Sequence, residues 1–188
     1  MTLASLDLSN RSYPRFEPVS PLPRVWIGFL FAGAFLWAEF AEVEPGNPDA
    51  IGPYRLMAAL AGWFYWLFCV YRFHKILREI SRDADGDPTY RTTPWQAVGY
   101  HFVPIYIVVW LFKWPIDLVE YVNSHSSVRM MPGGLLGTLL FVSIVVLRFY
   151  DGAASLATTF GLGLYIAGKL RQAVLEYERI RGAAEVFE

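Results

Sequence analysis

Charged residues and cysteine are scarce in this sequence of 188 residues, and each shortage excludes a class of protein. Charged residues make up 18% of the chain, against about 25% in soluble domains. The 16 basic and 17 acidic residues give a net charge of −1, so we expect no basic surface for nucleic acid. The single cysteine, Cys69, excludes an internal disulfide framework, and no cysteine–histidine spacing is typical of a zinc site.

Catalytic motifs are also lacking. The sequence contains no nucleophile elbow, zinc-protease helix, phosphate-binding loop or paired-carboxylate motif, so we do not expect an enzyme. The three histidines, His74, His101 and His125, lie far apart in the chain, and we therefore expect neither a haem nor a metal site. What the chain has in excess is apolar character, with 55% hydrophobic and 17% aromatic residues. This composition excludes disorder and predicts an integral membrane protein.

Five apolar stretches follow a proline-rich arm at residues 1–24, which we expect to be extended and to lie on the cytoplasmic membrane surface. The first two stretches are 18 to 19 residues long, which is enough to cross a hydrocarbon core of about 30 Å. The charged segment 169–188 is expected to be a cytoplasmic, solvated extension of the last helix. In chain order the apolar stretches of this helical membrane domain (residues 25–168) cover about residues 25–43, 54–71, 94–114, 131–147 and 153–168.

The distribution of lysine and arginine separates two topologies, because the cytoplasmic flanks of membrane helices collect these residues. If all five stretches cross, nine basic residues lie inside and seven outside. If residues 94–114 instead enter, turn at Pro104 and leave on the same side, 14 lie inside and only Arg55 and Arg148 lie outside. The sequence therefore favours an all-α protein with four transmembrane helices plus a proline-broken re-entrant segment, with both termini cytoplasmic. Five transmembrane helices, the third one kinked, remain the alternative.

The break at Pro104 is also the candidate ligand or ion site. Proline cannot donate a hydrogen bond to the carbonyl of Tyr100, so a helix break costs little there. A broken helix leaves unpaired carbonyl and N–H groups, which transporters use to bind ions. His101, Pro104 and Tyr106 would form this site. The alternative is that neighbouring helices satisfy these groups, with His101 bonded to a backbone carbonyl.

A signature accompanies the third stretch, and it resembles a family of small bacterial membrane proteins with the pattern TTP..AVG…FIPFYN.YW.F followed by an asparagine. The likeness covers about residues 72–124, and the chain departs from it at Ile107, where the family has asparagine, and by an acidic insertion at residues 83–87. The family carries no agreed activity, so the resemblance implies membrane topology and no chemistry. The matching segments are RTTPWQAVG (91–99), FVPIY (102–106), WLF (110–112) and YVN (121–123).

Two sets of charged residues are candidates for contacts at the membrane ends. Arg55 can pair with Glu39 or Glu42 at the outer end of the first two spans, although Glu39 can equally face water. Basic residues on one helix face are suited to anionic lipid head groups, and these are Arg72, Lys75, Arg78 and Arg82.

Small residues at four-residue spacing predict a helix-packing seam, either within the chain, above all between the fourth and fifth stretches, or with another subunit. They are Gly28, Ala32, Gly133, Gly137, Ala153, Ala157 and Gly161. We expect a non-enzymatic accessory or scaffold subunit of a larger membrane assembly, in contact with lipid and with other membrane subunits or further copies of the chain. Its expected location is a bacterial inner membrane or an internal membrane derived from it. The alternative is a small transporter or channel that uses the break at Pro104.

Overall fold

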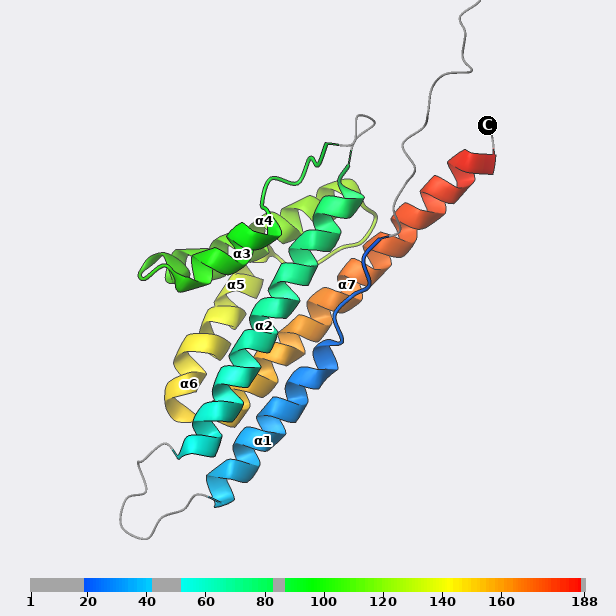
Figure 1. Ribbon diagram of the computed structural model, residues 1–188. Coiled ribbons are helices and arrows are strands. Elements are labelled where there is room, and N and C mark those ends of the chain that lie inside the picture. Colours follow the sequence, from blue (N-terminus) through cyan, green and yellow to red (C-terminus); the bar gives the residue numbers. More distant parts are fainter. Residues whose placement is uncertain (1–18, 42–51, 83–86, 187–188) are drawn as a thin grey trace, which may run out of the picture.

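The computed structural model describes residues 19–41, 52–82 and 87–186, with side chains as far as Ile180. Within these ranges every regular element is a helix, which confirms the expected all-α class (Figure 1). The elements in chain order are η2 (Val25–Ile27), α1 (Gly28–Ala41), α2 (Pro53–Ile80), α3 (Pro94–Gly99), η3 (Tyr100–Phe102), α4 (Tyr106–His125), α5 (Gly133–Phe141), the π-helical segment η4 (Val142–Val146), α6 (Leu147–Tyr150) and α7 (Gly152–Val186).

Four helical rods make up the bundle: α1, α2, the continuous run α5–η4–α6, and α7 (Figure 1). Successive rods alternate in direction, and α7 packs against all three of the others. The interior is aromatic, with Trp66, Trp114 and Phe160 fully buried. The segment α3–η3–α4 begins and ends at the same end of the bundle (Figure 1), so the described part of the chain consists of four long rods and a helical hairpin across one end.

Among the described residues, two helices are long and apolar enough to cross a membrane, fewer than the four that the sequence predicts. These are Pro53–Ile80 and Gly133–Tyr150. The apolar helix Val25–Ala41 falls short in length. The first turns of α7 contain Ser155, Thr158 and Thr159 among small residues, which lowers their hydropathy.

Several helix boundaries lie beyond the apolar stretches. α2 continues past residue 71 to Ile80, and α7 continues through the charged segment to Val186. An apolar run marks the part of a helix that meets lipid or core, whereas arginine, lysine, glutamate and leucine continue the helix into polar surroundings. The apolar stretch 94–114 likewise ends before its helix does, because Pro115 is buried inside α4 and the helix runs on to His125.

Side-chain contacts show that the chain reverses direction at Pro104 rather than kinking. The indole N–H of Trp110 donates to the carbonyl of Ala97, 13 residues earlier, at 2.9 Å. In a continuous helix these residues would be about 20 Å apart. The Tyr100 ring also lies against Tyr106 and Trp110, with centroid distances of 4.9 and 4.8 Å. The proline therefore separates two antiparallel helical pieces. A re-entrant segment needs such a reversal of the backbone at Pro104.

A tight turn forms the tip of this hairpin. The N–H of Tyr106 donates to the carbonyl of Pro104 at 2.7 Å, which closes a γ-turn around Ile105. Ile105 has a φ of 66° and is 87% exposed. A β-branched residue at positive φ is strained by about 1–3 kcal/mol. The packing of Tyr100, Tyr106 and Trp110 behind the tip holds the turn closed.

Candidate functional site

The three residues of the predicted site at the helix break are not brought together. The His101 ring is buried, with Nδ1 2.8 Å from the carbonyl oxygen of Ala97 and its edge toward Trp63 of α2. Pro104 is exposed at the hairpin tip. Tyr106 lines a separate polar cleft on the hairpin. His101 therefore has the arrangement given above as the alternative to a ligand site, in which its ring bonds to a backbone carbonyl.

A buried cluster of aromatic residues and histidine joins the hairpin to α2. The Tyr90 hydroxyl lies 2.9 Å from Nδ1 of His74, and both residues are buried. Burial raises the pKa of Tyr90 above its ordinary value, so its hydroxyl stays protonated. We therefore assign Tyr90 as the donor and Nδ1 as the acceptor, which places the proton of neutral His74 on Nε2. Trp110 and Trp114 pack around the His74 ring.

Buried nitrogen atoms around this cluster have no hydrogen-bond partner among the described residues. They are Nε2 of His74, Nε2 of His101 and Nε1 of Trp114, together with Nε1 of Trp66 deeper in the bundle. A buried polar group without a partner costs about 1–3 kcal/mol, so such groups are few in folded proteins. No group of three or more histidine, cysteine or carboxylate side chains in the described ranges is arranged to hold a metal ion.

A polar cleft of about 540 Å³ lies on the hairpin, and its walls combine tyrosines with charged residues from α4. Its Lys113 and Asp117 are paired with each other at 3.0 Å. The His125 ring stacks on Tyr121 with a centroid distance of 4.2 Å. These groups suit the binding of a flat polar molecule. The sequence signal for the cleft is the four-residue recurrence of residues 113, 117, 121 and 125 along one face of α4.

The predicted basic face divides into two parts. Lys75, Arg78 and Arg82 line a groove of about 490 Å³ that also includes Trp95. Arg72 lies apart from them and donates to the carbonyl of Pro21. This contact, with the bonds from the N–H and hydroxyl of Ser20 to Glu79, fixes the described end of the arm along α2. Arg72 is thus a structural residue, and three of the four predicted lipid contacts share one surface.

The predicted outer-end group is described only in part. Glu39 is exposed near the end of α1, and Arg55 lies in the first turn of α2, at the same end of the bundle (Figure 1). Glu42 lies outside the described residues.

The small-residue seam connects different helices from those expected. A Cβ atom on Gly133 or Gly137 would meet the backbone of α4, at 2.5 Å from Cα of Ile116 and 2.9 Å from Cα of Phe112 respectively. The glycines of the fourth stretch therefore face the hairpin, not the fifth stretch. Gly28 packs under the Phe160 ring of α7, and Ala32 and Ala153 are buried while Ala157 is half-buried. Gly161 is exposed with open space around it, so it is not part of a helix contact.

The residues of the signature hold the hairpin together. Thr93 and Gln96 form reciprocal capping bonds at the start of α3. The carbonyl of Ala97 accepts from Trp110, and Oδ1 of Asn123 accepts from the N–H of Met130. Each of these contacts is structural. No known family model, curated protein or solved structure matches the chain.

Proposed function

We propose that the chain is a multi-pass membrane protein in which all four rods of the bundle cross the bilayer. The observation that carries this proposal is the apolar outer surface of the rods. Only 22% of the apolar window of Gly133–Tyr150 and 39% of that of Pro53–Ile80 is buried inside the molecule. Leu36, Trp37 and Phe40 extend the same exposed surface along α1. A monomeric soluble protein does not leave so much contiguous apolar surface in water.

The hairpin lies across one end of the bundle (Figure 1), so we propose that it rests along the cytoplasmic membrane surface with its apolar tip in the interfacial region, and does not enter the hydrocarbon core as the expected re-entrant segment would. Its exposed Trp95 and Ile105 are suited to that depth. The groove of Lys75, Arg78 and Arg82 beside Trp95 would then face anionic lipid head groups. This placement keeps both termini cytoplasmic and leaves only Arg55 and Arg148 outside. A bacterial inner membrane, or an internal membrane derived from it, is the proposed location.

Within that membrane we assign the chain a non-catalytic role as an accessory or scaffold subunit. Several polar side chains of the described ranges hold the fold: Glu79 binds the arm, Glu176 binds the α4–α5 loop at Ser127, and Asn123 closes the same loop. A protein whose polar groups are used in this way, and whose outer surface is large and aromatic, is suited to binding other membrane helices.

Native purification in a mild detergent tests this role. We expect a particle much larger than the 21.4 kDa chain in its micelle, with a second protein present in fixed proportion. A reporter fused after Glu188 should be cytoplasmic, and one inserted within residues 44–49 should be periplasmic. A particle of one to a few copies would contradict the accessory role, and a periplasmic C-terminus would contradict the four-span topology.

A second candidate function is a small transporter or channel, favoured by the unpartnered Nε2 atoms of His74 and His101 in the interior. If it is correct, His74→Ala and His101→Ala should each abolish solute flux in liposomes without lowering the amount of inserted protein. Unchanged flux in these variants, or no flux in the parent chain, would exclude this function.

A further inference from the structure

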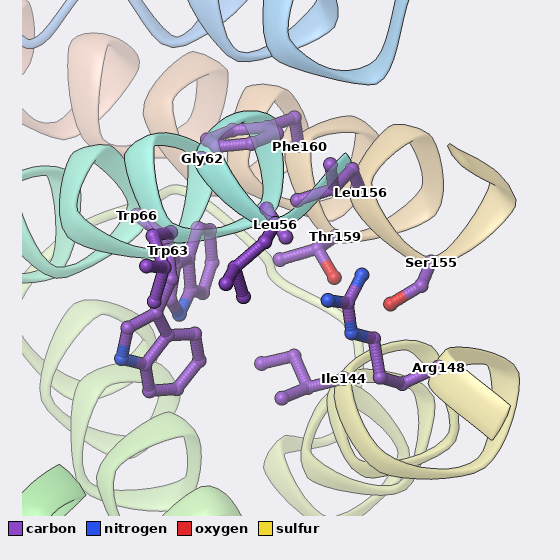
Figure 2. A pocket seen from close by; sticks show the side chains of 12 residues that line it. Leu56, Gly62, Trp63, Trp66, Ile144, Arg148, Ser155, Leu156, Thr159 and Phe160 are labelled. Carbon is purple, nitrogen blue, oxygen red and sulfur yellow. The ribbon is translucent and has the colours of Figure 1, made fainter. Parts of the chain in front are cut away.

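A cavity of about 240 Å³ lies between α2 and the α5–α6 rod, with α7 as its floor (Figure 2). Both α2 and the α5–α6 rod pack on α7. Leu56 and Leu60 of α2, at one wall, are exposed to the outside. In the proposed membrane placement this side faces lipid. A molecule can therefore enter the cavity sideways from the bilayer.

One end of the cavity is cationic. Figure 2 shows the guanidinium of Arg148 projecting into it, on the side where the hydroxyls of Ser155 and Thr159 also face. Arg148 stacks over the Phe35 ring, with Cζ 5.3 Å from the centroid. No carboxylate or carbonyl of the described residues pairs with its N–H groups. Arg148 is exposed in the last turn of α6, so its side chain is open to the outer membrane interface as well as to the cavity, and its guanidinium is available to an anionic head group.

The hydroxyls of Ser155 and Thr159 differ in whether they are free to donate a hydrogen bond to a ligand. Ser155 already donates to the carbonyl of Ser143, at 2.7 Å, in the π-helical segment η4. Thr159 donates to no described acceptor, so its hydroxyl is available beside the guanidinium. An anion at this point would receive charge-assisted hydrogen bonds from Arg148 and an O–H bond from Thr159.

The remainder of the cavity is apolar. Trp63, Trp66 and Ile144 line it together with the leucines of α2. Its volume is below the 300–1,000 Å³ that is typical of sites for whole small molecules. It therefore has room for a head group and the first part of one acyl chain, while the rest of the chain extends into lipid between the helices.

We propose that this cavity binds a single-chain amphiphile with an anionic head, either a carboxylate, as in a fatty acid, or a phosphate, as in a lysophospholipid. Arg148 and Thr159 hold the head, and the aromatic wall holds the chain. The proposal gives a role to Arg148 on the outer side, where the topology places only one other basic residue, Arg55. It rests on the proposed membrane placement but not on the accessory role.

Tryptophan quenching by brominated ligands tests the proposal, because Trp63 and Trp66 line the cavity. The full chain is placed in nanodiscs of neutral phosphatidylcholine and titrated with a dibrominated fatty acid, a brominated lysophosphatidic acid, and a brominated monoglyceride of the same chain length. We expect saturable quenching by at least one anionic ligand, and a linear response to the neutral one. The lower midpoint identifies the head group. Saturation by neither anion, or equal saturation by the monoglyceride, overturns the proposal.

Charge variants separate the site from general partition into lipid. Arg148→Gln should raise the midpoint about 10-fold to 100-fold, whereas Arg148→Lys should recover part of the loss. Arg171→Gln removes the same charge from an exposed position of α7 and should titrate like the parent. Thermal unfolding of each variant checks its fold. Thr159→Leu is a second, independent variant that should weaken binding, because it removes the hydroxyl and fills the head-group end of the cavity. An unchanged midpoint in folded Arg148→Gln would refute the proposal. The assay needs no partner protein, so this proposal can hold even if the accessory role is disproved.

Discussion

Replacing Gly133 with alanine is expected to destabilise the protein by about 2–3 kcal/mol, because it forces α5 away from α4. The new Cβ would lie 2.5 Å from Cα of Ile116 and 3.2 Å from its backbone nitrogen. Backbone atoms cannot rotate aside as a flexible side chain can, so one helix must shift as a whole. The two helices share an extensive contact, and a shift would loosen all of it. The free energy of unfolding can be measured by denaturant titration in mixed micelles.

The neighbouring glycine is a matched control. A Cβ on Gly134 meets nothing within 4 Å, and alanine is a better helix former than glycine by about 1 kcal/mol. Gly134→Ala should therefore leave stability unchanged or raise it slightly. Equal effects of the two substitutions would show that α4 and α5 do not pack as closely as described.

The second large effect is expected at Trp110. Its side chain is 1% exposed, donates to the carbonyl of Ala97 and contacts the Tyr100 ring. Trp110→Ala should cost about 3–5 kcal/mol and open the hairpin, because the indole hydrogen-bonds α4 to α3. Trp110→Phe keeps most of the packing and should cost only about 1–2 kcal/mol, the value of a buried hydrogen bond and its desolvated acceptor.

Hydrogen exchange locates this effect. The amides of residues 97–110 should exchange faster in Trp110→Ala, while those of α7 keep their protection. Trp95→Ala is the control, because that side chain is 73% exposed and packs only on Tyr71 among the described rings. A uniform loss of protection along the chain would mean that the hairpin is not a separate unit of stability.

The hairpin shows which structural features can be predicted from local sequence and which cannot. A proline in the middle of an apolar stretch and a one-sided count of lysine and arginine predict the reversal, because both are properties of the chain alone. The position of Trp110 against Ala97 depends on how the two pieces pack after the turn. That α4 is continuous through Pro115 also depends on tertiary structure, since packing against α5 outweighs the one hydrogen bond that proline removes.

The glycine seam and the candidate sites show what residue spacing alone cannot predict, namely which elements a residue faces. Spacing identifies Gly133 and Gly137 as places of close approach, but not α4 as the helix that approaches. Periodicity likewise does not exclude Gly161, which faces open space. His101 and Tyr106 are near in sequence yet face different surroundings, because the turn between them redirects their side chains.

By itself, the sequence determined that the chain is all-helical and apolar, and that it breaks at Pro104, since composition, backbone chemistry and charge distribution are local quantities. Only the tertiary structure decided which helices meet, which polar groups lose their partners, and that Arg148 projects into a cavity with Thr159. Those features arise from contacts between residues distant in the chain, and their energies depend on packing that no single segment contains.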